Sequence, residues 1–491
     1  MKRFLKPVVL LSAVAMLVYA LMWAESAGAQ DSLVTFRNRQ REVKRELDIN
    51  MVEVEYSDDF FQLDWGGWFT GSYQLFHDNG IISGGTIVQG VHERHLGDYD
   101  LRLWSRTDFG NLAQIYARVR TEYVDWEIDD SLTSQDHYLD GPNLDRGWGY
   151  FDLRRAAQDW QEEPLGWTVN ARVGRQYVEW GSGLVLSLPL DAVVVGGEFG
   201  DFHLRGIAGQ SITSFYNIDR SFEPAGDIAG RLRRDFFGGE MNFGGFKRHR
   251  PYVYALRAVD RTRTPAGAAQ MYSYDSWYYG VGCRGILWRP ECTYSTEFIW
   301  QDGEGYSDVS SGAGGNQLES IEAFAFDSQV NYFVGGANKP KFSVQYTFGS
   351  GDSDRMRPSD TINGNIKGTT DSGFNAFGFR YTGCSFAPVV TNIHVLRMGF
   401  AFLPFPEQES LEALEIGADV FGYASATEGG ISDSSAGTGS QSLGYEADAH
   451  IYWRMTSDLS LVVRYGVFFP GGAFVDDTER HNLYTGITLM F

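Results

Sequence analysis

The chain has 491 residues, a formal net charge of −22, an aromatic content of 15%, 58 glycines and 14 prolines. This acidic balance argues against nucleic acid as a partner. The three cysteines, Cys283, Cys292 and Cys384, are too few for a disulfide scaffold. Many glycines and aromatic residues with few prolines favour short alternating strands and tight turns over a helical enzyme.

The first residues predict export from the cytoplasm. A basic start over residues 2–6 precedes an apolar run over residues 7–23, and Ala27-Gly28-Ala29 is a small-residue cleavage site. Residues 1–29 therefore match a removable secretory signal peptide, with an N-terminal membrane anchor as the alternative. No later apolar run reaches the roughly 18 residues that a membrane-spanning helix needs. An exported chain of this kind is either soluble or a β-barrel.

The rest of the chain divides into a short polar region and a long region of strands. Residues 30–59 are rich in charge and do not alternate, which predicts a polar periplasmic N-terminal arm, and residues 60–491 predict a transmembrane β-barrel. At roughly 10 residues per strand, we expect an all-β, antiparallel barrel with a single wall of roughly 16–18 strands. The predicted strands cover residues 66–76, 99–109, 114–126, 147–153, 167–177, 252–259, 278–287, 293–300, 322–333, 341–348, 374–381, 391–402, 412–422, 445–454, 459–469 and 483–491. Tracts rich in Gly, Ser and Asp predict long external loops over residues 302–316, 349–371 and 427–441.

The carboxy-terminal stretch has the clearest alternation. Alternate residues from Leu483 to Phe491 share one face of a strand, and the run Tyr445–Arg454 sets an apolar face against a charged one. Because a sheet in lipid cannot leave an open edge, this ending favours a strand that closes a barrel. The alternative is an edge strand of a soluble sheet, which would show the same periodicity.

Arginines recur on one face of several predicted strands, opposite apolar residues. Arg118 and Arg120, for example, oppose Ala117 and Val119. Since an arginine that faces lipid near the bilayer midplane costs about 2–4 kcal/mol, we expect these side chains to point into the lumen. A ladder of guanidinium groups attracts anions, whereas acidic residues on the same faces predict a wall held by ion pairs. The candidate pore-lining residues from this reasoning are Arg102, Arg106, Arg118, Arg120, Arg172, Arg257, Arg454 and Arg464.

No catalytic constellation emerges from the sequence. The stretch Gly280–Gly285 matches a dinucleotide fingerprint but lies inside an apolar strand-like run that opens no helix. No nucleophile elbow is present either. We therefore expect no enzyme activity, no cofactor and no metal site. Cys283 and Cys292 flank a predicted turn, so a disulfide and two unpaired thiols are both compatible with the pattern.

Three stretches resemble the alginate export family of outer-membrane barrels: Val173–Gly181, Tyr346–Asp352 and Tyr445–Gly472. The resemblance implies a bacterial outer-membrane protein whose arginine-rich constriction passes an anionic exopolysaccharide. It also adds Arg175 and Gln176, which match the Gly-Arg-Gln triplet of the family, to the candidate pore-lining residues.

Residues and resemblance together predict an outer-membrane channel that passes an anionic polysaccharide or oligosaccharide through an arginine-lined lumen. The alternative is a general or small-solute porin with the same fold, and an outer-membrane hydrolase built on a barrel is a third hypothesis. The expected partners are the transported polysaccharide or small anionic solute, outer-membrane lipid and the barrel-assembly machinery, without nucleic acid.

Overall fold

The computed structural model describes residues 30–31, 61–82, 86–87, 92–110, 112–127, 136–153, 167–212, 233–262, 270–308, 316–355, 358–359, 361, 364–433 and 436–491. The predicted signal peptide, and the polar arm beyond residue 31, lie outside the described residues. Among those described, no helix is long and apolar enough to cross a membrane.

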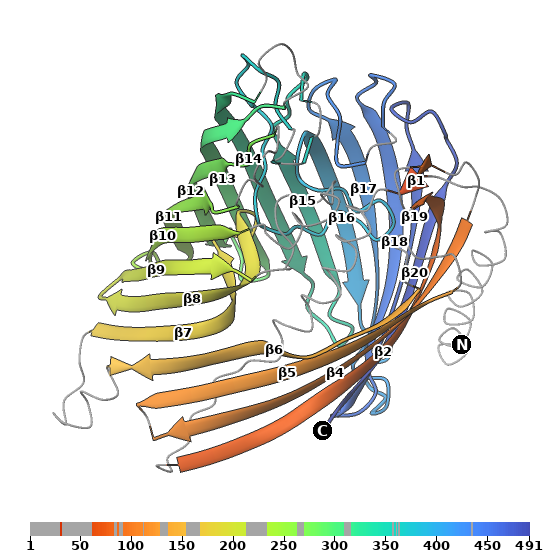
Figure 1. Cartoon of the computed structure of the whole chain (residues 1–491). Helices are drawn as coiled ribbons and strands as arrows, with labels where there is room; N and C mark the ends of the chain where they lie inside the picture. Colours follow the sequence, from red (N-terminus) through yellow and green to blue (C-terminus); the bar gives the residue numbers. More distant parts are fainter. Residues whose placement is uncertain are drawn as a thin grey trace, which may run out of the picture.

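In the described part of the chain, eighteen strands form one closed antiparallel barrel, and strands that follow one another along the wall are hydrogen-bonded neighbours (Figure 1). The first nine are β2 (Phe61–Ile82), β4 (His92–Phe109), β5 (Ala113–Trp126), β6 (His137–Asp152), β7 (Trp167–Trp180), β8 (Leu186–Phe199), β9 (Phe202–Ser211), β10 (Arg234–Phe243) and β11 (His249–Asp260). The other nine are β12 (Tyr274–Ile286), β13 (Cys292–Tyr306), β14 (Leu318–Phe333), β15 (Lys341–Gly349), β16 (Ile393–Phe402), β17 (Leu414–Ser425), β18 (Ser442–Arg454), β19 (Leu459–Pro470) and β20 (Arg480–Met490). The two-residue strands β1 (Gln30–Asp31) and β3 (Thr86–Ile87) pair with β2.

The barrel closes where its first and last strands meet. β2 pairs antiparallel with β20 from Trp68 opposite Met490 to His77 opposite His481. Beyond the end of β20, the Gly67 N–H donates to the Phe491 carbonyl at 2.8 Å, and the Phe491 N–H donates to the Gly67 carbonyl at 2.9 Å. The expected closing strand at the carboxy-terminus is therefore present, and no edge of the sheet is left open.

Deletion of Phe491 should reduce the amount of assembled barrel several-fold, because it removes the last pair of backbone hydrogen bonds at the closure. The measurement is the fraction of protein in the outer membrane that changes its gel mobility on heating. Phe491→Ala is the matched control, since it keeps both backbone hydrogen bonds. Equal amounts of heat-modifiable protein from the deletion and the intact chain would contradict this role.

The two ends of the barrel differ in their connections. The end that holds Phe61 and Phe491 has short turns such as residues 110–112, 200–201 and 455–458, whereas the opposite end carries the connection over residues 350–392. In outer-membrane barrels the short turns are periplasmic and the long loops are extracellular. The end that holds Phe61 and Phe491 is therefore the periplasmic end, and the end with the connection over residues 350–392 is the extracellular end.

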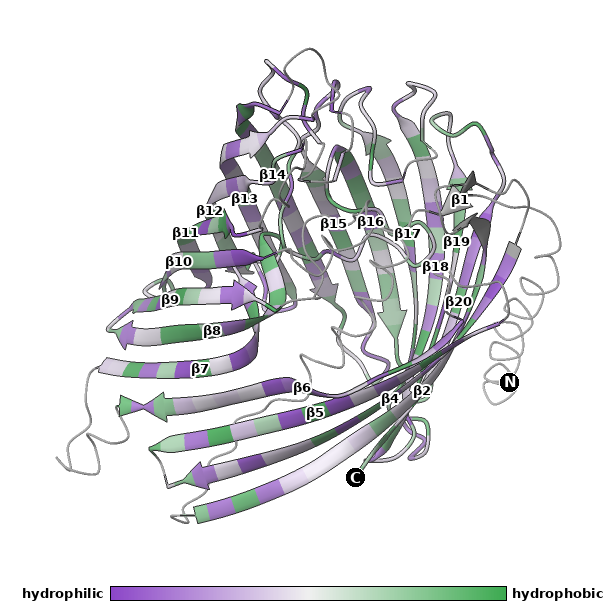
Figure 2. Ribbon diagram, viewed as in Figure 1, coloured by the Kyte–Doolittle hydropathy of each residue, from purple (hydrophilic) through white to green (hydrophobic). Residues whose placement is uncertain are grey.

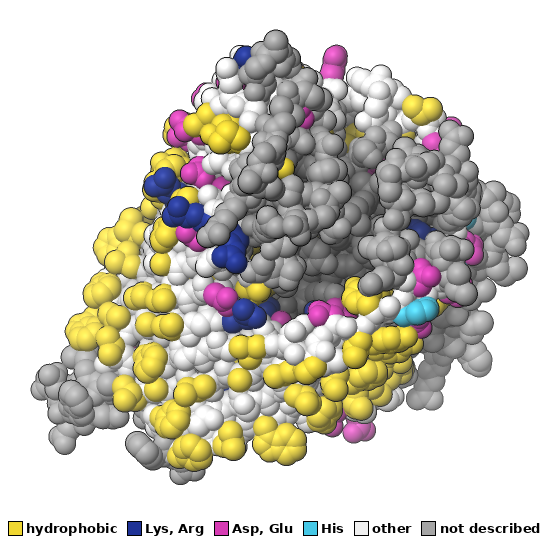
Figure 3. Space-filling model, in the orientation of Figure 1, with side chains coloured by type: hydrophobic (Ala, Val, Ile, Leu, Met, Phe, Trp, Pro, Cys, Tyr) yellow, Lys and Arg dark blue, Asp and Glu magenta, His cyan; other side chains and the backbone are white. Residues whose placement is uncertain are grey.

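Side chains alternate between the two faces of the wall. On β4 and β5 the outward residues include Leu103 and Val119, which are 49% and 40% exposed, whereas their neighbours Arg102 and Arg118 are buried. Figure 2 shows this alternation as bands of opposite hydropathy along the strands. Figure 3 shows hydrophobic side chains covering the outer side of the wall, with charged side chains along the edge of the hollow. An apolar outside and a polar inside suit a barrel in a membrane.

Some predicted elements are wrong. Residues 374–381 form no strand, and β8, β9 and β10 lie where no strand was predicted. The upper part of β8 is buried on both faces, so its sequence lacks the alternation of a lipid-facing strand. The predicted loop over residues 302–316 begins inside β13, which continues to Tyr306. Cys283, Cys292 and Cys384 form no disulfide bond. The register sets Cys283 opposite Thr296, so Cys283 and Cys292 do not face each other across the hairpin.

Candidate functional site in the barrel lumen

Residues 371–392, called here the inward segment, cross the space inside the barrel between β15 and β16. At one side the Phe377 N–H donates to the Val185 carbonyl at 2.8 Å. At the other side the Phe386 ring stacks on Phe468 of β19, with 4.2 Å between ring centroids. The predicted external loop over residues 349–371 therefore leads into the lumen, where the chain forms an internal hydrophobic core with β8.

Two carboxylates on the inner face of β18 hold the middle of the inward segment. Glu446 accepts hydrogen bonds from the N–H groups of Ser385 and Phe386 at 2.5 and 2.8 Å. Asp448 accepts from the Cys384 N–H at 2.9 Å. Glu446 is fully buried and Asp448 is 5% exposed. A buried carboxylate without hydrogen-bond donors destabilises a fold. The three backbone N–H groups therefore stabilise Glu446 and Asp448 inside the barrel, and the two carboxylates in turn hold the segment in place.

A second set of polar contacts holds the segment to the opposite wall. Arg380 forms an ion pair with Asp327 of β14 at 3.2 Å and donates to the Ser182 hydroxyl at 2.9 Å. The Ser182 N–H in turn donates to Glu297 of β13 at 2.7 Å. The turn between β7 and β8 is thus joined to both the inward segment and the wall. Glu297 is buried and also accepts a hydrogen bond from the Tyr252 hydroxyl.

The start of the inward segment carries a buried ion pair. Arg355 and Asp371 lie 3.1 Å apart, and both side chains are 2% exposed. Burial raises the pKa of Asp371, and the Arg355 guanidinium opposes that rise. This pair joins the connection that follows β15 to the start of the inward segment.

Arginines and acids alternate along the inner wall of β4, β5 and β6. Arg102 donates to Asp100 at 2.9 and 3.1 Å, and Arg120 donates to the same carboxylate at 2.6 Å. Arg118 donates to Asp145 at 2.6 Å and is fully buried. Arginine-carboxylate contacts of this kind fix the planes of the guanidinium groups. The wall is therefore a ladder of positioned ion pairs.

Aromatic rings flank two of these arginines and Arg172 of β7. The Arg102 and Arg118 guanidinium carbons lie 5.7 and 5.2 Å from the Trp68 ring, and that of Arg172 lies 4.6 Å from the Trp148 ring. Stacking on a ring face stabilises a cation and limits its motion. These rings keep the guanidinium groups against the wall.

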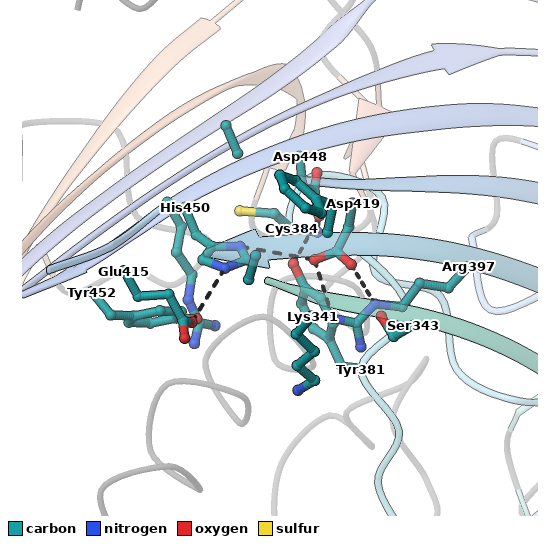
Figure 4. Close-up of a pocket in the computed structure, with 14 residues that line it drawn as sticks. Lys341, Ser343, Tyr381, Cys384, Arg397, Glu415, Asp419, Asp448, His450 and Tyr452 are labelled. Carbon is teal, nitrogen blue, oxygen red and sulfur yellow. Dashed lines mark hydrogen bonds and ion pairs between the residues drawn. The ribbon is translucent and has the colours of Figure 1, made fainter. Parts of the chain in front are cut away.

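A cavity of about 250 Å³ lies between the inward segment and the inner wall of β15–β19 (Figure 4). Arg397 donates to both oxygens of Asp419 at 2.8 and 3.1 Å, and Arg464 lies 5.3 Å from the Tyr452 ring. Acidic and basic groups alternate here as they do on β4–β6. The acidic, basic and histidine side chains that line it are Lys341, Arg397, Glu415, Asp419, Asp448, His450 and Arg464.

Most of the predicted pore-lining residues lie on inner faces. They are Arg102, Arg106, Arg118, Arg120, Arg172, Gln176, Arg454 and Arg464. Arg106 pairs with Asp64 at 2.6 Å, and Arg454 is exposed at the periplasmic end of β18. The Gln176 amide donates to the Ala192 carbonyl at 3.0 Å and is 2% exposed, so it fastens β7 to β8.

Two of the predicted pore-lining residues face outward, which corrects the prediction. Arg175 shares its face with the exposed Val173 and forms an ion pair with Asp191 at 2.8 Å. Arg172 and Arg175 are three positions apart, and a strand sends such residues to opposite faces. Arg257 shares its face with Val253 and lies 5.4 Å from the Trp277 ring, near the extracellular end of β11. Arginine costs little near the membrane interface.

The sequence reasoning missed part of the cavity lining. Arg397 alternates with apolar residues in the predicted strand over residues 391–402, so the parity that selected Arg464 would also have selected it. Lys341 begins its strand, where alternation gives little signal. Tyr381, whose hydroxyl donates to Asp448 at 2.8 Å, lies on the inward segment and was assigned to a wall strand.

A closed barrel with an apolar outer face and a charged lumen defines an outer-membrane channel. The chain belongs to the alginate export family, because the model of that family matches residues 237–487, slightly more than half of the chain. It is therefore a protein of the bacterial outer membrane. No curated protein sequence matches it.

Two of the solved structures to which this chain is similar come from Pseudomonas aeruginosa. The outer membrane protein OpdK aligns with a TM-score of 0.50 and 9% identity, covering 88% of this chain and 99% of that chain. OccK5 (OpdH) aligns with a TM-score of 0.49 and 9% identity, covering 88% of this chain and 98% of its own. At this identity the likeness to OpdK concerns the fold alone.

Proposed function

We propose that this channel passes an anionic polysaccharide or oligosaccharide through an arginine-lined lumen. The observation that carries the proposal is the presence of arginines on the inner faces of two parts of the wall, with Arg102 and Arg118 on β4 and β5 and Arg397 and Arg464 on β16 and β19. Membership of the alginate export family supports an anionic polymer as the substrate.

The ion pairs of the wall suit transport better than tight binding. A guanidinium group offers two parallel donors to a carboxylate, which matches an acidic sugar. In this lumen each passing carboxylate competes with a wall carboxylate, such as Asp100 beside Arg102 and Arg120. Because a substrate carboxylate replaces a wall carboxylate at the arginine, the net gain in binding free energy is small. The substrate can therefore leave each site.

A small-solute porin is the second candidate function, and the inward segment favours it. The segment crosses the lumen, and the cavity beside it holds about 250 Å³, which suits a single small carboxylate better than a polymer chain. In this function the same arginines select small anions. Passage of a polymer requires the inward segment to move.

The reversal potential of the purified channel in a planar bilayer, under a salt gradient, tests the proposal. We expect anion preference that increases as the salt concentration falls, because screening extends over about 8 Å at physiological salt. Block by oligogalacturonate supports the acidic-saccharide substrate. Anion current without such block supports the small-solute porin, and cation preference would refute both.

A further inference from the structure

Basic side chains gather at the periplasmic end of the barrel over β10–β15. The turns over residues 244–248, 287–291 and 334–340 lie at this end and join strands that are neighbours in the wall. All of these side chains are exposed, and within the described part of the chain none makes an ion pair. The residues are Lys247, Arg248, Arg250, Arg284, Arg289 and Lys339.

Arg250 and Arg284 form the centre of this patch. The register sets them directly opposite each other on β11 and β12, and both share the inner face with Tyr252. The Arg284 guanidinium carbon lies 5.1 Å from the Tyr252 ring, and one of its nitrogens lies 3.5 Å from the Asn242 amide oxygen. Like charges directly opposite each other destabilise a strand pair. These arginines differ from Arg102 and Arg118, which have carboxylate partners.

Acidic side chains gather at the extracellular end of β13 and β14. Acidic residues occupy the upper ends of β13 and β14 and the neighbouring loops. They include Asp302, Glu304, Asp308, Glu319, Asp352 and Asp354. The charge of this part of the wall therefore changes from basic to acidic along the barrel axis. A fixed charge at a channel mouth raises the local concentration of ions of opposite sign.

We propose that the basic patch over β10–β15 is a capture site for an anionic polysaccharide that enters from the periplasm. This proposal rests on the proposed function and assigns it a direction, because the patch lies only at the periplasmic mouth. Arg250 and Arg284 face the lumen, so their ligand enters the channel and is not a lipid headgroup on the outer surface. Uronate carboxylates supply the bidentate acceptors that the two guanidinium groups lack.

The test is the block of single channels by oligogalacturonate added to one chamber and then to the other. In the wild-type channel we expect half-block at a lower concentration from one chamber. In the double variant R250Q/R284Q, the concentration for half-block from that chamber should rise about tenfold, because each exposed charge contact contributes up to a factor of about five. Block from the other chamber should not change.

The double variant E407Q/E409Q is the matched control, since it changes two exposed charges at the same end of the barrel. It should keep the asymmetry of block. An anion-selective wild-type channel that is blocked equally from both chambers would overturn the capture site and leave the proposed function standing. Asymmetry that survives in R250Q/R284Q would overturn it as well. Cation selectivity of the wild type would refute the proposed function itself.

Discussion

The double variant E446Q/D448N should raise the single-channel conductance several-fold. Glu446 and Asp448 accept hydrogen bonds from the backbone of Cys384, Ser385 and Phe386, which holds the inward segment across the lumen. An amide side chain can turn a donor toward these N–H groups and carries no charge to attract them. Each buried donor left without an acceptor costs about 1–3 kcal/mol, so the segment should leave its position for part of the time.

Glu415→Gln is the matched control, because Glu415 lines the same cavity, whereas the inward segment is held by Glu446 and Asp448. It removes a lumenal negative charge without loosening the segment. Conductance in planar bilayers and the noise of the open channel are the measurements. If E446Q/D448N conducts like the wild type while both proteins are fully heat-modifiable, then the aromatic packing of Phe386 on Phe468 is sufficient to hold the segment.

The double variant R118Q/R120Q should lower the permeability ratio of anions to cations several-fold. Arg118 is paired with Asp145, and Arg120 with Asp100 and Glu122. Asp100 then keeps Arg102 as a partner and Asp145 keeps Arg146, but the wall loses two positive charges in a narrow space where charges are poorly screened. The effect on the reversal potential should be largest at low ionic strength, because the Debye length is longest there.

Arg261→Gln provides the control for selectivity. Arg261 is 58% exposed beyond the extracellular end of β11, where it pairs with Asp235. Its loss should leave the permeability ratio unchanged. The heat-modifiable fraction of each variant separates a change in selectivity from a failure to fold, since breaking a buried ion pair destabilises a protein by about 3–5 kcal/mol. A folded R118Q/R120Q channel with wild-type selectivity would exclude this part of the wall from the ion path.

The wall of the barrel was predictable wherever one face meets lipid and the other meets polar groups. The run Tyr445–Arg454 shows this well, because apolar residues alternate with the acids that become the anchors of the inward segment. The first part of β8 does not alternate, since its inner face packs against Phe377 inside the lumen. Residues 374–381 are apolar for the same reason, and that pattern imitates a strand of the wall.

The inner faces of β4 and β5 were also predictable. Side chains alternate between the two faces of a strand, and the free-energy cost of arginine in lipid assigns the face with arginines to the lumen. The path of residues 371–392 through the lumen was not predictable from the sequence. The Gly, Ser and Asp composition that precedes it is typical of external loops, and its partners are distant in sequence. Glu446 binds amides that lie about 60 residues away, and Arg380 binds Ser182 at a separation of 198 residues. A pattern within a short stretch of sequence cannot predict contacts between residues so far apart.

The arginine ladder has a further consequence for the way the barrel forms. A shift of one residue in the pairing of two strands turns every side chain to the other face. For β4 and β5 such a slip would move Arg102, Arg118 and Arg120 from their carboxylates into lipid, at about 2–4 kcal/mol for each group near the midplane. The ion pairs therefore favour the correct register of β4 and β5 while the barrel inserts into the membrane. They raise the free energy of a sheet whose strands are displaced by one residue, even when its backbone hydrogen bonds are complete.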